Sequence, residues 1–156
     1  MKPIGIVILG LFLMVPCAAL SDDREAAVRT AIQSFYKAFD DGFVGPADYA
    51  TEDWNHINPL GGRDRGLEAT LKTVREVHQT FLKGATDTIE NMDIRFADQN
   101  VAVGTVTSIG SPFTSPDGVK HSAGRAIRTF VVVNRGGRWL IMQDQSTMVV
   151  IDLPAR

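Results

Sequence analysis

The strand pattern in the second half of the chain limits the fold most strongly. After residue 87, segments with alternating apolar side chains are separated by turn sequences such as Asp98-Gln99-Asn100 and Arg135-Gly136-Gly137. Turns of this kind join neighbouring strands, so we predict an antiparallel meander of long strands. The predicted strands are Thr88–Phe96, Val101–Ile109, Ser122–Asn134 and Trp139–Val150, with a loop over Gly110–Gly118.

The first half of the chain has helical spacing instead. Apolar residues recur every three or four positions over Asp23–Asp41 and again over Leu67–Lys83, which predicts two amphipathic helices. A short helix is expected after Pro46, through Asp48 to Ala50, because proline favours the first helical position. Trp54–Asn58 is expected to be extended, because the turn sequence Pro59-Leu60-Gly61-Gly62 follows it.

His78 lies on the apolar face of the second predicted helix, together with Leu71, Val74 and Phe81. A buried ionisable ring is costly unless it has a polar partner or lines a pocket. We therefore expect His78 either to line a pocket, where it can transfer protons near neutral pH, or to be a hydrogen-bonded core residue.

The last two strands are apolar on both faces. A sheet with one face in water normally alternates more cleanly between apolar and polar residues. A second copy of the chain covering the outer face would explain the pattern, so we predict a homodimer.

The first 21 residues are typical of a cleaved secretory signal: Lys2 precedes the apolar run Ile4–Val15, and Pro16 and small residues follow. This run is shorter than the ~20 residues of a membrane span, so a stable span is not expected. An acylated Cys17 or an uncleaved anchor are the alternatives. We thus predict a periplasmic or secreted protein with one domain, residues 22–156, whose mature form has no cysteine.

The charge pattern argues against nucleic acid as a partner. The net charge is −2, and lysine and arginine do not cluster as phosphate binding requires. We also predict no metal site, because His56, His78 and His121 lack a metal-ligand spacing. No cofactor is expected, since the chain has no dinucleotide, flavin or redox-cysteine motif.

The order of these elements resembles the nuclear transport factor 2-like superfamily, and most closely its SnoaL-like branch (SgcJ/EcaC-type, ketosteroid-isomerase-like). The resemblance covers nearly all of residues 22–156. The residues that carry it are Asp53-Trp54, Ile57-Asn58-Pro59, Arg65-Gly66, His78–Gly84, Gly137–Ile141 and Gln145-Ser146-Thr147. It implies an α+β cone, in which a curved antiparallel sheet wraps around about three helices and a pocket opens between helices and sheet. Members include isomerases, cyclases and dehydratases as well as binding modules, so the fold alone does not settle the function.

Residues from several elements are expected to line this pocket. His78, His56 and Asn58 are the candidate catalytic residues, because two imidazoles and an amide can move a proton and polarise an oxygen. The expected substrate-binding residues are Phe35, Phe39, Trp54, Phe81, Arg125 and Gln145. The resemblance favours Gln145 facing inward, which would turn Asp144 toward the dimer side, paired with Arg128.

Together these features favour an isomerase, cyclase or dehydratase that acts on a small apolar molecule by His-assisted proton transfer. Two alternatives remain open. One is a non-catalytic module that binds such a molecule, and the other is a structural dimer whose cone is filled by its own side chains.

Overall fold

The computed structural model describes residues 17–149, with side chains described from residue 23. Residues 1–16, which hold most of the predicted signal, lie outside the described part. No helix within the described part is long and apolar enough to cross a membrane. The helices are α1 (Cys17–Asp40) and α2 (Leu67–Gln79), and the strands are β1 (Ala50–Ile57), β2 (Arg63–Arg65), β3 (Asp87–Asp98), β4 (Val101–Gly110), β5 (Phe113–Thr114), β6 (Lys120–His121), β7 (Gly124–Arg135) and β8 (Arg138–Met148).

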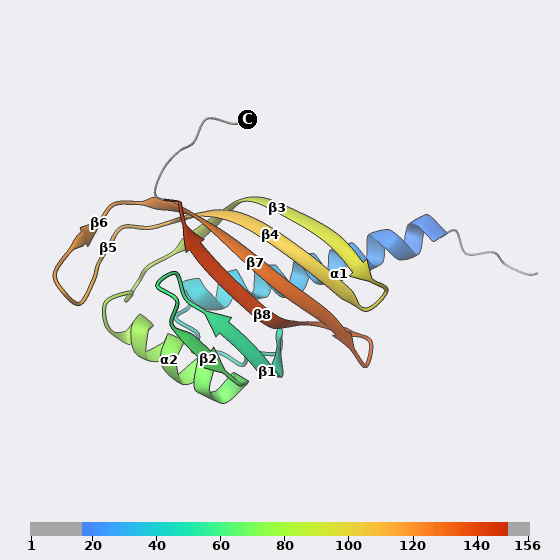
Figure 1. The fold of residues 1–156 in the computed structure, drawn as a ribbon, viewed down its shortest axis with the longest axis horizontal. Coiled ribbons are helices and arrows are strands. Elements are labelled where there is room, and N and C mark those ends of the chain that lie inside the picture. The colour runs from blue at the N-terminus through green and yellow to red at the C-terminus, as the bar shows by residue number, and fades with distance from the viewer. Residues whose placement is uncertain (1–16, 150–156) are drawn as a thin grey trace, which may run out of the picture.

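The predicted α+β fold with a curved antiparallel sheet is confirmed (Figure 1). Six strands form the main sheet in the order β2-β1-β8-β7-β4-β3, and β5 and β6 form a separate small hairpin. The meander β3-β4-β7-β8 is antiparallel throughout, whereas β1 adds to the edge of β8 in parallel. The β1–β8 register places His56 directly beside Asp144.

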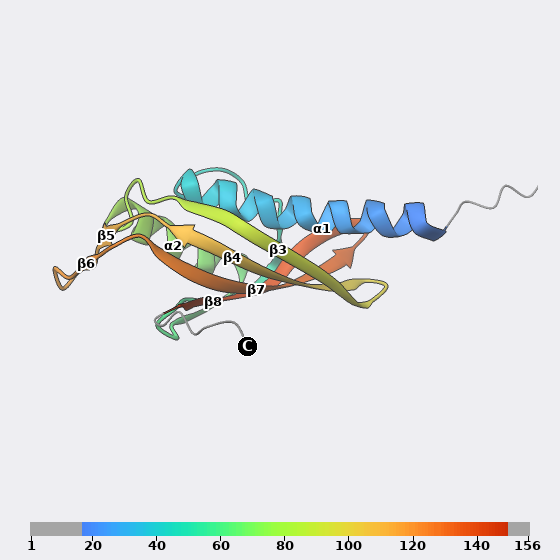
Figure 2. The ribbon, with the colours of Figure 1, turned by 90° about the horizontal axis from the view of Figure 1, so that it is seen from above.

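Helix α1 runs along one face of the sheet, which we call the inner face (Figure 2). Its buried side chains include Val28, Ile32 and Phe35, in agreement with the predicted apolar face. Gly104 of β4 permits the close approach, because a Cβ there would lie 2.5 Å from Cδ1 of Ile32. The centre of the fold is therefore packed with side chains.

Phe35 lies at the centre of this packing. Its ring makes edge contacts with five neighbours at centroid distances from 5.3 Å (Phe130) to 6.2 Å (Tyr49), and one of them is the fully buried Trp54. Edge-to-face geometry adds to the large apolar area that aromatic rings bury. The middle of the cone is thus a core, and polar side chains are found toward one end of the sheet.

The predicted short helix after Pro46 is wrong, and the described part has two helices where about three were expected. Residues 44–49 form turns instead, in which the Ala50 N–H donates to the Ala47 carbonyl at 3.0 Å before β1 begins. α1 also begins earlier than predicted, and α2 ends at Gln79 rather than Lys83.

A bulge in β8 reverses the predicted orientation of Asp144 and Gln145. Val131 pairs with Gln143 but Val132 pairs with Ile141, so Met142 is an extra residue in the ladder. Strict alternation from the inward Ile141 would have turned Gln145 inward. Because the extra residue shifts the alternation, Asp144 is fully buried on the inner face and Gln145 is exposed on the outer face.

Candidate functional site

Figure 1 shows α2 and the β5–β6 hairpin near one end of the sheet. Buried polar side chains gather on the inner face toward this end. At this end β3 and β7 begin, and β1, β4 and β8 finish. We call these residues the polar belt. It consists of His56, Asp87, Ser108, Arg128, Asp144 and Ser146, all of which are buried.

Asp144 is the centre of one half of the polar belt. Its carboxylate accepts hydrogen bonds from Trp54 Nε1 at 2.8 Å and from Arg128 Nη1 at 2.6 Å. His56 Nδ1 lies 3.0 Å from both carboxylate oxygens. Burial alone would raise the pKa of Asp144, but His56, Arg128 and Trp54 outweigh it and lower the pKa. Asp144 is therefore a carboxylate that stays ionised at neutral pH.

This carboxylate fixes the orientation of His56. Because Nδ1 faces Asp144, the Nδ1–H tautomer leaves the lone pair of Nε2 free to accept a proton. No hydrogen bond to Nε2 is found among residues 17–149, and the His56 side chain keeps 10% of its exposure while Asp144 has none. The pair resembles in its geometry a base held by an orienting carboxylate.

Arg128 lies between Asp144 and the aromatic core. Its guanidinium carbon is 4.7 Å above the Phe35 ring, and one N–H donates to Asp144. A guanidinium has five N–H donors, so several remain for other acceptors. Arg128 thus supplies positive charge and hydrogen-bond donors to the inner face beside His56.

The other half of the polar belt is centred on Asp87, the first residue of β3. Its backbone N–H donates to Asp40 Oδ1 at 2.9 Å, and Tyr36 donates to Ser108 Oγ at 3.4 Å nearby. Burial raises the pKa of Asp87, and the carboxylate of Asp40 acts in the same direction. Ser108 and Arg128 favour the ionised form but do not outweigh burial.

The three predicted catalytic residues do not converge. Asn58 accepts backbone hydrogen bonds from Leu60 and Gly62, at 2.9 Å and 3.0 Å, and so closes the turn after β1. His78 is wedged between Phe39 and Phe43, with ring centroids 4.5 Å and 5.2 Å away. Burial lowers the pKa of His78, so the ring is neutral at pH 7. Within the described part, no hydrogen bond or ring contact joins His78 to His56.

The predicted substrate-binding residues lie in several separate parts of the molecule. Phe35 and Trp54 contact the polar belt from the core side, and Phe39 packs on His78. Arg125 and Gln145 are wrong as pocket residues, because the β8 bulge and the β7 alternation put them on the outer face. There Arg125 forms an ion pair with Glu90 at 2.6 Å. Phe81 lies beyond α2 and contacts Phe113 of β5 at 6.3 Å.

Sequence reasoning missed Asp87 and Ser108 as site candidates, and it placed Arg128 and Asp144 on the wrong face. The predicted pairing of Arg128 with Asp144 is nevertheless confirmed. The available signal was that both charges interrupt otherwise apolar strands, since a charge at such a position is buried only with a partner.

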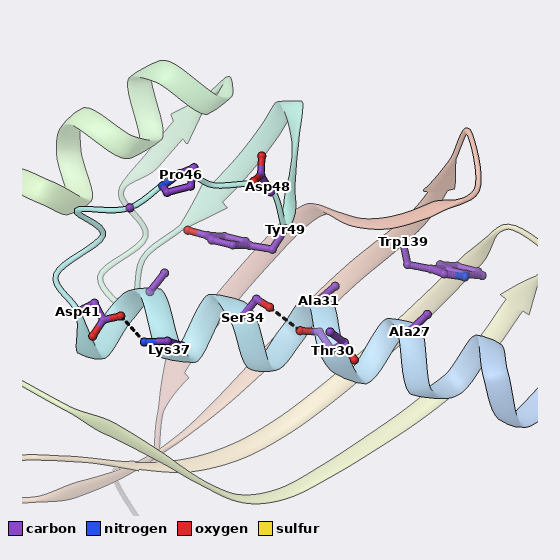
Figure 3. Close-up of a pocket in the computed structure, with 12 residues that line it drawn as sticks. Ala27, Thr30, Ala31, Ser34, Lys37, Asp41, Pro46, Asp48, Tyr49 and Trp139 are labelled. Atoms are coloured by element: carbon purple, nitrogen blue, oxygen red, sulfur yellow. Dashed lines mark hydrogen bonds and ion pairs between the residues drawn. The ribbon is translucent and has the colours of Figure 1, made fainter.

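A separate groove, with a volume of about 410 Å³, lies between α1, the segment before β1 and Trp139 of β8 (Figure 3). Tyr49 and Trp139 stand on one side of it, and Ala27, Ala31 and Ser34 of α1 lie on the other. Lys37 and Asp41 form an ion pair at one end, at 2.6 Å. No residue of the polar belt lines this groove. Residues 17–149 contain no cluster of three or more His, Cys, Asp or Glu that could hold a metal ion.

Comparison with known proteins supports the fold through solved structures. No protein-family model matches the chain, and no curated protein matches it. An uncharacterised protein with a cystatin-like fold from Caulobacter vibrioides superposes with a TM-score of 0.76 at 22% identity, over 82% of this chain and 91% of that one.

Two structures whose names state an activity are also similar. A putative scytalone dehydratase from Novosphingobium aromaticivorans has a TM-score of 0.70 at 16% identity, over 89% of this chain and 93% of that one. A hexachlorocyclohexane dehydrochlorinase of type 2 has a TM-score of 0.74 at 14% identity, over 89% of this chain and 99% of that one.

An NTF2-like protein with a cystatin-like fold, also from Novosphingobium aromaticivorans, matches at a TM-score of 0.69 with 14% identity, over 85% of this chain and 86% of that one. The chain therefore has a cystatin-like fold, in agreement with the α+β architecture that its sequence predicted.

Proposed function

We propose that the protein is a cofactor-independent lyase or isomerase that removes a proton from carbon in a small, largely apolar substrate. One observation carries the proposal: a fully buried, ionised Asp144 holds His56 by Nδ1, and Nε2 has no hydrogen-bond partner among the described residues. The dehydratase and dehydrochlorinase among the structural neighbours are named for eliminations, which begin with or include loss of such a proton. This supports His56, rather than His78, as the base.

Each residue of this half of the belt has a role in the proposed reaction. Nε2 of His56 accepts the proton, and the resulting imidazolium is stabilised by the Asp144 carboxylate. The free N–H groups of Arg128 donate to the oxygen on which negative charge develops. Trp54 and Phe35 exclude water from behind the pair, which strengthens both interactions. Asp144 orients His56 and is not itself protonated.

Proton exchange on simple substrates tests this function. The protein is incubated in D2O with a panel of β-hydroxy and β-chloro ketones, and deuterium uptake and elimination are followed by ¹H NMR. We expect His56→Gln to slow exchange by about 10²–10⁴-fold, the usual contribution of a general base. Gln145→Ala, on the outer face, is the matched control and should leave the rate unchanged. Equal rates in the wild type and His56→Gln would remove the proposal.

The groove beside α1 favours a second candidate function, the binding of a small apolar molecule without catalysis. Its volume of about 410 Å³ is within the usual size range of ligand pockets, and its walls combine alanines with two aromatic rings. Native mass spectrometry of protein purified from its host would detect a retained molecule. Ser34→Trp fills the groove and should abolish retention, whereas His56→Gln should not.

We further propose that two copies pair through the outer face of the sheet, and that the chain is exported. Side chains there are uncharged over the centre of β4, β7 and β8, and Ile127 and Ile109 are 42% and 38% exposed. Light scattering should give a dimer mass that Ile127→Arg reduces to a monomer. Val44→Arg, at an exposed position before β1, should leave the dimer intact. Export is tested by fractionating the host cell.

A further inference from the structure

Two aromatic side chains in the wall of the groove beside α1 have polar atoms without a partner. Tyr49 and Trp139 keep only 7% and 8% of their exposure, and both line the groove. The part of the chain that the structure describes supplies no hydrogen bond to the Tyr49 hydroxyl or to the Trp139 indole N–H. Polar groups of such buried residues normally have a partner, so these two atoms are available to a ligand in the groove.

The core holds both rings in place. Tyr49 makes edge contacts with Phe35 and Trp54, with ring centroids 6.2 Å away in each case, and Trp139 packs on Phe96 at 5.7 Å. Figure 3 shows that the two rings extend in opposite directions along the groove, Tyr49 toward the ion-pair end and Trp139 toward the other. Burial raises the pKa of Tyr49, so its hydroxyl stays protonated at neutral pH and can donate. The groove therefore has one fixed donor toward each end.

The floor between these donors is long and apolar. Alanines form much of it, and the lining extends from Ala27 to Asp41, which is about 21 Å along the helix at 1.5 Å per residue. Thr30 and Ser34 also line it, but their hydroxyls already donate to backbone carbonyls one turn earlier, at 2.9 Å and 2.8 Å. An extended peptide would bring polar backbone groups at every residue, which this floor cannot pair. An alkyl chain needs no partner there.

The charges that line the groove disfavour an anionic ligand. Lys37 is already paired with Asp41, at 2.6 Å. Asp48, the third charged residue of the lining, has no ion-pair partner within residues 17–149. One lysine and two aspartates give a net charge of −1, which repels a carboxylate or phosphate. An ammonium group would bring only N–H donors, and these cannot pair with the N–H of Trp139.

We propose that the groove binds an elongated, uncharged lipid with an oxygen acceptor toward each end. Its alkyl chain lies along the alanines, one oxygen accepts from the Tyr49 hydroxyl, and the other accepts from the Trp139 N–H. Long-chain hydroxy esters have this form, because methylene groups separate their hydroxyl from their ester oxygens. The inference rests on the second candidate function, binding in this groove, and adds the chemical class of the ligand.

Isothermal titration calorimetry with a matched series of probes tests the ligand class. Methyl ω-hydroxydodecanoate has both oxygens, methyl dodecanoate lacks the hydroxyl, and ω-hydroxydodecanoate has the same chain with an anionic end. We expect methyl ω-hydroxydodecanoate to bind most tightly. Methyl dodecanoate should bind about 3–10-fold more weakly, the usual effect of one neutral hydrogen bond, and the anion about 10-fold more weakly. Ser34→Trp, which fills the groove, should abolish binding of all three.

Two variants assign the donors. Tyr49→Phe and Trp139→Phe keep an aromatic ring and remove the donor, so each should weaken binding of methyl ω-hydroxydodecanoate by about 3–10-fold. With methyl dodecanoate, one of the two variants should have no effect, because the oxygen that its donor would bind is missing. Tyr36→Phe is the matched control, since the Tyr36 hydroxyl bonds Ser108 and does not line the groove, and it should leave binding unchanged.

The outcomes separate this inference from groove binding as such. If no probe binds the wild type, the inference is overturned, while native mass spectrometry still decides whether the groove retains any molecule. If Ser34→Trp blocks binding but the anion binds as tightly as the ester, groove binding stands and the proposed ligand class is wrong. Unchanged binding in both Tyr49→Phe and Trp139→Phe would have the same meaning.

Discussion

Asp144 and Asp87 lie on the same inner face and both are buried, Asp144 more deeply, yet the pKa of Asp144 is lowered and that of Asp87 is raised. Asp144 receives donors from Trp54, His56 and Arg128. Asp87 has a carboxylate close by and one oxygen with no partner. Burial alone therefore does not decide the charge of a buried acid. The number of donors that the fold supplies decides in which direction the pKa moves, and here it lowers the pKa of Asp144 and leaves that of Asp87 raised.

The largest expected effect comes from removing the fixed anion. Asp144→Ala leaves the Arg128 cation buried without its partner and two further donors without an acceptor. We expect the free energy of unfolding to fall by about 3–5 kcal/mol, measured by urea denaturation. The control is Asp53→Ala, whose carboxylate is 59% exposed in its pair with Arg135, and which should cost about 0–1 kcal/mol. Similar losses in the two variants would contradict the role of burial.

Removing one donor from each half of the belt should have unequal effects. Trp54→Phe deletes the Nε1–H that donates to the charged Asp144, a bond of a type worth about 1.5–3 kcal/mol, and it also removes some packing. Tyr36→Phe deletes a long, neutral bond to Ser108 and should cost about 0.5–1.5 kcal/mol. Denaturation of both variants gives the comparison. A larger loss in Tyr36→Phe would show that the Asp87 half is the more strongly bonded one.

The two acids should also give stability profiles of opposite slope with pH. The pKa of Asp144 is lowered in the folded protein. Its contribution to the free energy of unfolding is therefore fully present above the unfolded pKa of ~3.9 and is lost as pH falls through the folded pKa. The pKa of Asp87 is raised in the folded protein. Its contribution to the free energy of unfolding is therefore fully present below the unfolded pKa of ~3.9 and is lost as pH rises through the folded pKa.

Asparagine variants measure these slopes, since each tenfold difference in proton affinity between the folded and unfolded chain contributes about 1.4 kcal/mol. The free energy of unfolding of the wild type minus that of Asp144→Asn should increase with pH below about 4 and then level off. The same difference for Asp87→Asn should decrease with pH above about 4. The free energy of unfolding is measured by denaturation from pH 3 to pH 8. Two slopes of the same sign would contradict the opposite directions of the two pKa shifts.

Periodicity predicted the strands and the inward face of α1 because these depend on local alternation and on helical spacing. It predicted an amphipathic helix over Asp23–Asp41 and an extended segment over Trp54–Asn58, and the burial of Val28, Ile32, Phe35, Trp54 and His56 agrees with both. Asn58, predicted as a catalytic residue, precedes a proline-glycine turn, and its side chain serves that turn as an Asx motif.

The site depends instead on contacts between segments far apart in the chain. The Met142 bulge is set by how β8 fits β7, and no local residue pattern announces it. One extra residue moved Asp144 inward and Gln145 outward, so the predicted pocket wall contained the wrong member of the pair. Asp87 was missed for a related reason. Its Oδ1 has no hydrogen-bond partner among the described residues, and its neighbours across the sheet, Gly110 and then Gly124, are identified only by the strand register.

The smallest expected effect tests the bulge itself. Gln145 and Asp144 are adjacent, and the bulge decides which of them is buried. Because Gln145 is exposed on the outer face, Gln145→Ala should change the free energy of unfolding by no more than about 0.5 kcal/mol. Denaturation is measured on protein with the Ile127→Arg substitution, so that any pairing of two copies does not bury the residue. A loss near that of Asp144→Ala would mean that β8 follows strict alternation after Ile141, in which case Gln145 would face inward and the His56–Asp144 pair would not exist.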